Sequence, residues 1–263
     1  MSSTTRSICR RLSYLHRAKL SLLLPTITQK LAISTAQQKP GWMKDKFSGG
    51  RVESLIKQMG FHGLTVHDKE SLENASVKLY VSCSEYSDFQ LFRKRFDLED
   101  TFSAWADILN LHMWMLATRF NNSDTEYFAN DFEFLRARTT YHMWVDIDKR
   151  AKQIVRATKI RKKSIRALSD HFLGVVLLYD EGYQTDDKVL AGALWKCLLQ
   201  AREDVEPKDL LSLVDYVHRN LHHLKSLSDD QFFSGYVSFL PLDSDKPDVE
   251  KGKRVQSILT ALP

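Results

Sequence analysis

The sequence predicts an all-α protein, in which a multi-helix bundle domain follows an N-terminal leader and a short extended segment lies near the C-terminus. Three observations predict this class. The 263 residues are 43% hydrophobic and include only ten Gly and six Pro, which suits one sizeable core. Apolar residues recur every three to four positions along most of the chain, the period of an amphipathic helix. Neither an internal repeat nor an alternation of strand and helix patterns is present.

The leader covers residues 1–40, whose composition differs sharply from the rest of the chain. Residues 1–39 contain seven Lys and Arg and no Asp or Glu, and most of their Ile and Leu fall on one face of a helix. This combination is typical of a mitochondrial presequence; a basic disordered tail is the alternative. The rest of the chain has 31 basic and 33 acidic residues, so the net charge of +5 does not indicate nucleic-acid binding.

After the leader, residues 41–70 are expected to hold a linker and a first helix, and residues 71–243 the helical domain. Asp88, a natural N-cap, and Pro207, a first-turn proline, mark two helix starts. The most apolar segment, residues 101–120, is expected to be a central helix that contacts neighbours on most of its circumference. In chain order, the apolar spacing predicts helices over residues 52–59, 71–83, 89–96, 101–120, 125–155, 164–179, 185–198 and 207–224.

The connections between these helices carry their own signals. Gly182 is expected to end the helix over 164–179 in a left-handed conformation, and the Thr185 hydroxyl to cap the next helix, with two acids in its first turn. Residues 236–240 alternate apolar and polar side chains, which predicts the extended segment. Residues 244–263 are polar and are expected to form a mobile tail.

The sequence contains no recognisable catalytic motif. Glycine-rich phosphate loops and a G-x-S-x-G elbow are absent, and the three cysteines lie far apart, without the spacing of a disulfide framework or zinc module. Cys197 is interpreted as a small buried side chain. His218 and His222 are four residues apart but lack a third metal ligand. His112 could ligate haem, but a hydrogen-bonded core histidine is favoured. No catalytic residue, cofactor or metal is therefore predicted.

Two clusters of charge are candidates for recognition. Asp180, Glu181, Asp186 and Asp187 surround Gly182 and are interpreted as helix-end caps and a partner-recognition element. Their use with a cation by a small α-helical mitochondrial enzyme is the alternative. The second cluster is a basic block of eight Lys and Arg within residues 150–166, which would attract phosphates or anionic lipid headgroups. A merely solvated surface is its alternative, and no motif for sequence-specific nucleic-acid binding accompanies it.

Four segments occur in the order and spacing of one known family. The longest is Tyr179-Asp180-Glu181-Gly182 with Asp186-Asp187-Lys188-Val189-Leu190-Ala191-Gly192-Ala193-Leu194-Trp195. The others read L-E-D-T-F-S-A-W at 98–105, L-H-M-W-M at 111–115 and W-V-D-I-D-K-R at 144–150. Together they resemble the motifs of the ubiquinol–cytochrome c chaperone family, assembly factors for cytochrome b of the mitochondrial bc1 complex. The similarity covers about residues 75–242. Glu99, Gly192 and Lys196 replace the family's usual proline, alanine and arginine.

This resemblance implies a non-enzymatic chaperone on the matrix side of the mitochondrial inner membrane. Its expected partners are newly made cytochrome b, a small partner assembly factor, the mitochondrial ribosome and, peripherally, the inner membrane. A structural subunit of a mitochondrial particle is a further alternative. The residues expected to bind partners are Trp114, Trp144, Asp146, Arg150, Tyr179, Asp180, Glu181, Gly182, Asp186, Asp187 and Trp195. Those expected to contact ribosome or membrane are Lys152, Arg156, Lys159, Arg161, Lys162, Lys163 and Arg166. A chaperone for a membrane protein should expose apolar or aromatic surface, for which Trp114 is the candidate.

Overall fold

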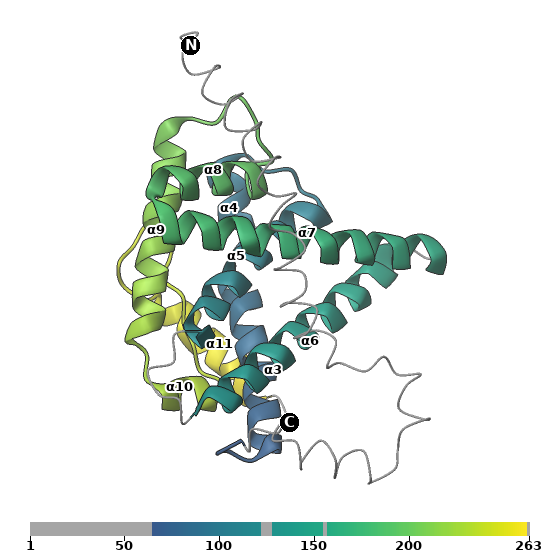
Figure 1. The fold of residues 1–263 in the computed structure, drawn as a ribbon, viewed down its shortest axis with the longest axis vertical. Helices are drawn as coiled ribbons and strands as arrows, with labels where there is room; N and C mark the ends of the chain where they lie inside the picture. The colour runs from purple at the N-terminus through teal and green to yellow at the C-terminus, as the bar shows by residue number, and fades with distance from the viewer. Residues whose placement is uncertain (1–64, 122–127, 155–156, 262–263) are drawn as a thin grey trace. The chain divides into compact units, whose positions relative to one another are not determined.

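The computed structural model describes residues 65–121, 128–154 and 157–261. Helices are the only regular elements in these ranges, which confirms the predicted all-α class, and none of them is long and apolar enough to cross a bilayer. They are α3 (Lys69–Tyr86), α4 (Phe89–Phe96), α5 (Phe102–Asn121), α6 (Ala129–Ile154), α7 (Thr158–Thr185), α8 (Asp187–Cys197), α9 (Pro207–Ser226), α10 (Asp229–Ser234) and α11 (Val249–Thr260) (Figure 1). The predicted presequence and the predicted helix over 52–59 lie outside the described residues.

Helix α5 is the central element, as its apolar sequence predicts. It packs against α3, α4, α6, α7 and α9, and Ile108 and Leu109 are fully buried. Asp107, a polar residue of α5, is buried as well, because α7 packs against α5. There the imidazole of His171 donates a hydrogen bond from Nε2 to Oδ1 of Asp107 at 2.9 Å. This carboxylate raises the pKa of His171, and burial raises the pKa of Asp107.

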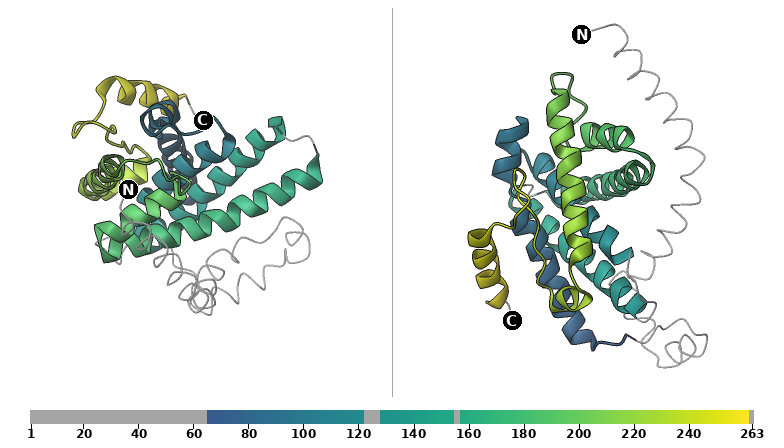
Figure 2. Two further views of the ribbon diagram at one scale, coloured as in Figure 1. Left: turned by 90° about the horizontal axis from the view of Figure 1, so that it is seen from above. Right: turned by 90° about the vertical axis from the view of Figure 1, so that its left-hand side faces the viewer.

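The two longest helices, α6 and α7, form an arm that starts and ends at the core. Helix α6 packs along α3, and α7 runs back from the end of α6 to pack against α8 (Figures 1 and 2). The contacts between the helices of the arm include an aromatic pair and an ion pair. The rings of Trp144 and Phe172 meet edge to face with centroids 5.8 Å apart, and Nε of Arg161 donates to Oδ1 of Asp148 at 3.2 Å. Apolar and charged contacts therefore both hold α6 and α7 together.

Several helix ends differ from the sequence expectations. Helix α7 starts at Thr158 and continues to Thr185, so it is longer at both ends than the predicted 164–179. The expectation of a left-handed cap at Gly182 is wrong, because this glycine is buried inside α7. The cap of α8 is Asp186 and not Thr185. The predicted starts at Asp88 and Pro207 are confirmed as the N-cap of α4 and the first turn of α9.

The C-terminal part of the chain contains a packed helix that its polar composition does not indicate. Residues 236–240 have no regular secondary structure, and the side-chain oxygen of Asn220 accepts a hydrogen bond from the Leu240 amide at 2.8 Å. In place of the expected mobile tail, α11 packs against α3 and buries Val255 and Leu259. These two residues are four apart and share one helical face, a stripe too short to be distinguished in a polar sequence.

Candidate functional site

The junction of α7 and α8 carries the acid cluster and the longest family-like motif. The two helices approach closely at Gly182. A Cβ atom at this position would lie 2.6 Å from Cα and 2.9 Å from N of Leu190 in α8, closer than folded proteins allow. Only glycine therefore permits the two backbones to lie in contact. This close approach determines where the start of α8 lies relative to the end of α7.

Asp186 fixes the start of α8. Its Oδ1 accepts hydrogen bonds from the amides of Lys188 at 2.8 Å and Val189 at 2.9 Å, two of the donors that a helix N-terminus leaves without partners. Asp187 is the first residue of the helix, and its Oδ1 lies 2.7 Å from Nε2 of His218 in α9. Asp186 therefore caps α8, whereas Asp187 forms a contact with α9.

This division of roles predicts unequal effects on stability. Asp186→Ala should lower the free energy of unfolding by about 1 kcal/mol, because it removes the acceptor of two amide hydrogen bonds. Asp187→Ala should cost only about 0.5 kcal/mol, because the Asp187 side chain is 71% exposed and its ion pair is solvated. The double variant should lose about 1–2 kcal/mol. Denaturant unfolding of the three variants measures these values. Equal losses for the two single variants would contradict the cap assignment.

Behind this junction, Trp114 of α5 joins the motif to the central helix. Its indole Nε1 donates a hydrogen bond to Oδ1 of Asp180 at 2.7 Å, and its ring packs on buried Tyr179 with centroids 5.1 Å apart. Burial raises the pKa of Asp180 above its usual range. The expectation that Trp114 is exposed is wrong, since only 1% of its surface is accessible once α7 covers α5. Trp114, Tyr179 and Gly182 thus hold α5, α7 and α8 together.

The surface of the junction is acidic and carries one aromatic ring. Glu181, Asp186 and Asp187 are exposed, and Asp180 is partly buried. Beside them, Tyr183 is 40% exposed, and its ring meets Trp114 edge to face at 6.2 Å. Sequence reasoning missed Tyr183, although its position one helical turn after Tyr179 was a signal. We call Glu181, Tyr183, Asp186 and Asp187 the acidic edge.

The other predicted partner residues lie apart from the acidic edge. Trp144 is partly buried on Phe172 of α7, as part of the arm. Asp146 and Arg150 face α3 and α5 instead. The Tyr80 hydroxyl donates to Asp146 at 2.6 Å, and the Arg150 guanidinium lies 4.8 Å from the Trp105 ring centroid.

Trp195 of α8 is also partly buried. Its indole Nε1 donates a hydrogen bond to the backbone oxygen of Arg202 at 2.7 Å. This bond links the side chain of Trp195 to the loop that follows α8. The structure therefore does not gather all the predicted partner residues into one patch.

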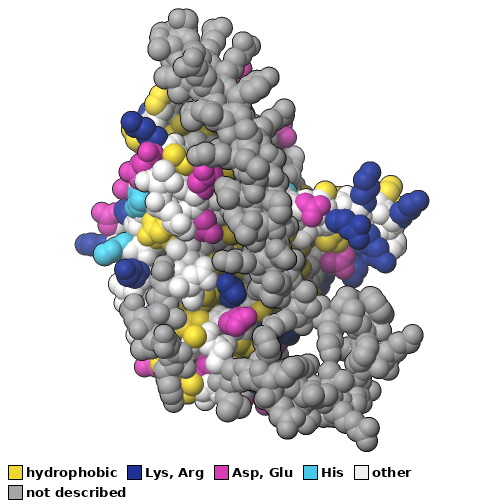
Figure 3. Space-filling view, in the orientation of Figure 1, with side chains coloured by type: hydrophobic (Ala, Val, Ile, Leu, Met, Phe, Trp, Pro, Cys, Tyr) yellow, Lys and Arg dark blue, Asp and Glu magenta, His cyan; other side chains and the backbone are white. Residues whose placement is uncertain are grey.

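The predicted basic block lies on the arm, where α6 meets α7, and Figure 3 shows Lys and Arg side chains gathered on this protruding end. Asp148 of α6 lies 2.7 Å from Nζ of Lys152 and also pairs with Arg161. These basic neighbours lower the pKa of Asp148. Lys159, Lys162, Lys163 and Arg166 are exposed and have no ion-pair partner in the described residues. Arg156 lies outside those residues.

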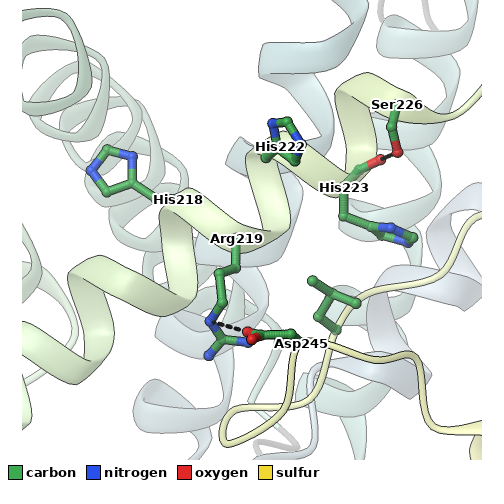
Figure 4. Close-up of a pocket in the computed structure, with 7 residues that line it drawn as sticks. His218, Arg219, His222, His223, Ser226 and Asp245 are labelled. Carbon is green, nitrogen blue, oxygen red and sulfur yellow. Dashed lines mark hydrogen bonds and ion pairs between the residues drawn. The ribbon is translucent and has the colours of Figure 1, made fainter.

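The histidines considered as ligands do not form a metal or haem site in the described part of the chain. A hollow of about 460 Å³ beside α9 is lined in part by His218, His222 and His223, but their rings point in different directions (Figure 4). The described residues hold no group of three or more His, Cys, Asp or Glu able to bind one ion, and this includes the acid cluster. Arg219 faces the hollow, with its Nε 3.4 Å from Oδ1 of Asp245.

His112 and Cys197 are core residues, as the sequence analysis favours. Nδ1 of His112 lies 2.8 Å from the Ile108 carbonyl oxygen, and Nε2 lies 2.7 Å from the Tyr216 hydroxyl. Burial lowers the pKa of His112 to about 4, so the ring is neutral. Cys197 is buried, and burial raises the pKa of its thiol to about 11.

A family model and curated relatives both match this chain, and they indicate the same family. The family model described as "Ubiquinol-cytochrome C chaperone" matches residues 94–239. The chain is 32% identical over 221 residues to Ubiquinol-cytochrome c reductase complex assembly factor 1 of Homo sapiens, a match that covers 84% of this chain and 71% of that protein. It is 31% identical over 232 residues to Protein CBP3, mitochondrial, of Saccharomyces cerevisiae, covering 82% and 69% of the two chains.

A solved structure shares the fold. The crystal structure of the Cbp3 homolog from Brucella abortus matches with a TM-score of 0.56 at 19% identity, and the match covers 73% of this chain and 98% of that one. The 94–239 match of the family model contains all four motifs found in the sequence, including the α7–α8 junction.

Proposed function

Since the chain belongs to the ubiquinol–cytochrome c chaperone family, we propose that it binds and stabilises newly made cytochrome b while complex III is assembled. The family consists of non-enzymatic assembly chaperones, and this chain is homologous to complex III assembly factors at about 30% identity. Cytochrome b is the client that the sequence motifs imply. The matrix side of the mitochondrial inner membrane is the proposed location, close to the ribosome on which the client is made.

The α7–α8 junction is the observation that supports this proposal best. Its buried residues, Trp114, Tyr179 and Gly182, make a rigid base from three helices. On this base the acidic edge presents carboxylates and one aromatic ring to solvent. Such a surface suits a protein partner that offers basic side chains or free backbone amides, because charged hydrogen-bond acceptors select those donors. The acidic edge is therefore the proposed contact for cytochrome b or for the small partner factor.

The basic block is the proposed contact with a phosphate-bearing surface, either the ribosome or the inner membrane. Its exposed Lys and Arg would meet RNA phosphates without reading a sequence, because the block contains no aromatic side chain for base stacking. The cation-dependent enzyme is not retained: Asp186 is engaged as a helix cap, Asp180 is bonded to Trp114, and the family is not enzymatic. A finished-particle subunit would copurify stoichiometrically with that particle, whereas an assembly factor leaves it.

Depletion of this protein in the organism that encodes it is expected to reduce the amount of assembled complex III. The cytochrome b absorbance of mitochondria isolated from the depleted cells should fall as well. Native electrophoresis and difference spectra measure the two quantities. Re-expression of wild type should restore both, whereas the charge-reversed variant Glu181→Lys with Asp187→Lys should not, because it inverts the acidic edge. Glu203→Lys with Asp243→Lys, at two exposed acids elsewhere, is the matched control and should restore assembly. Unchanged cytochrome b after depletion would refute the proposed function.

A further inference from the structure

The outer end of the arm exposes two large aliphatic side chains. Ile154, the last residue of α6, is 64% exposed, and Ile160, near the start of α7, is 59% exposed. Single exposed apolar residues are common on protein surfaces, but these two lie on either side of one helix–helix connection. We call the described residues 149–154 and 157–166 the arm tip. Each isoleucine would gain free energy if its side chain left water.

Ile160 lies beside basic residues of α7 that have no ion-pair partner in the described part of the chain. At 100° per residue, Lys159, Lys162, Lys163 and Arg166 share one face of α7, while Arg161 points the other way. The structure agrees with this arrangement, because Arg161 is turned inward to Asp148 and only 13% of its side chain is exposed. The contact between Arg161 and Asp148 holds the basic face outward. No acid occurs within residues 149–166 to offset it.

This pairing of aliphatic and basic side chains distinguishes between two phosphate-bearing surfaces. RNA phosphates would attract the basic side chains, but RNA has no apolar layer in which an isoleucine side chain could be buried. Proteins that bind single-stranded RNA or DNA stack the bases on aromatic rings, and residues 149–166 contain none. A bilayer with anionic headgroups satisfies both features, because aliphatic side chains enter the boundary between headgroups and acyl chains while Lys and Arg remain at the phosphates. None of the described helices could cross a bilayer, so any such contact made by them is peripheral.

We propose that the arm tip docks on an anionic bilayer surface, with Ile154 and Ile160 inserted and the basic face of α7 at the headgroups. This docking proposal adds a contact surface to the proposed location at the inner membrane, and it rests on that location for its role in the cell. Its test needs only the purified protein. The arm would then hold the chaperone at a bilayer while leaving the acidic edge, near the other end of α7, away from the lipid.

Flotation of the purified full chain with vesicles tests the proposal. Wild type should bind phosphatidylcholine vesicles that contain phosphatidylglycerol and should not bind phosphatidylcholine alone. Ile154→Ser with Ile160→Ser keeps every charge and should weaken binding about tenfold. Lys162→Glu with Lys163→Glu keeps both isoleucines and should weaken it by more than about twentyfold, from about fivefold per basic residue removed. Leu211→Ser is the matched control, because Leu211 is 69% exposed on α9, and it should bind as wild type does.

Two outcomes would overturn the proposal. One is equal vesicle binding by wild type and the Ile154→Ser, Ile160→Ser variant. The other is tighter binding of wild type to single-stranded RNA than to anionic vesicles, weakened only by the charge reversal, which would assign the basic face to RNA. Circular dichroism of each variant checks that the helical fold is retained. Because the vesicle assay contains no cytochrome b, its failure leaves the chaperone function to be decided separately by the depletion experiment.

Discussion

Gly182→Ala is expected to lower the free energy of unfolding by about 3 kcal/mol, although alanine is the better helix former. The added methyl carbon would lie 2.6 Å from Cα of Leu190, a backbone atom that no rotamer change can move aside. Helices α7 and α8 would have to separate, which would loosen the packing of buried Leu190 and Leu194. The separation would also displace the Asp186 cap, so the acidic edge would lose its arrangement together with the stability.

Gly174→Ala is the matched control for this prediction. Gly174 lies in the same helix two turns earlier, and nothing lies within 4 Å of the Cβ position there. This variant should gain about 0.5–1 kcal/mol, because alanine loses less backbone entropy than glycine when a helix forms. Urea unfolding of both variants beside wild type measures the difference. A neutral or stabilising Gly182→Ala would contradict the close approach of α7 and α8.

Acidification from pH 6.5 to pH 4 is expected to cost about 3 kcal/mol of stability through His112 alone. The unfolded imidazole takes up a proton near the ordinary histidine pKa of 6.5, whereas burial lowers the pKa of the folded residue to about 4. Between these values the unfolded state therefore binds more protons, so the free energy of unfolding falls as the pH falls. The folded ring stays neutral chiefly because it is fully buried, which penalises the charged form more than the Ile108 carbonyl, an acceptor of Nδ1–H, favours it. In the neutral ring Nε2 accepts a hydrogen bond from the Tyr216 hydroxyl.

His112→Gln isolates this contribution. Glutamine offers one donor and one acceptor but does not titrate, so the variant should be less stable than wild type at pH 7 and should lose less stability on acidification. Other groups contribute in both proteins, including His142 and His223, whose pKa values burial also lowers. Their effects cancel when the pH dependence of the variant is subtracted from that of wild type. Identical pH profiles from pH 4 to pH 6.5 would show that His112 is not held neutral.

Local patterns in the sequence were sufficient for the fold class and for most helices within the described residues. The spacing of apolar residues identified the central helix, and the residue types at Asp88 and Pro207 marked two helix starts. Each of these signals depends on a few neighbouring residues, since caps and amphipathic stripes act within one or two turns. The four motifs also led to the correct family, because their order and spacing can be read without any structure.

The largest errors of the sequence reasoning concern features that depend on which helices meet. Trp114 was expected to be exposed, but α7 buries it, and Asp180, 66 positions later, accepts its indole hydrogen bond. Gly182 looked like a helix cap, whereas the backbone of α8 requires it inside a helix. Residues after Asp243 looked mobile, but α3 offers a surface on which Val255 and Leu259 are buried. A periodic pattern records the preference of each residue for an environment. Only the packing of distant segments determines which preferences are met, because burial and hydrogen bonding depend on the partner as much as on the residue.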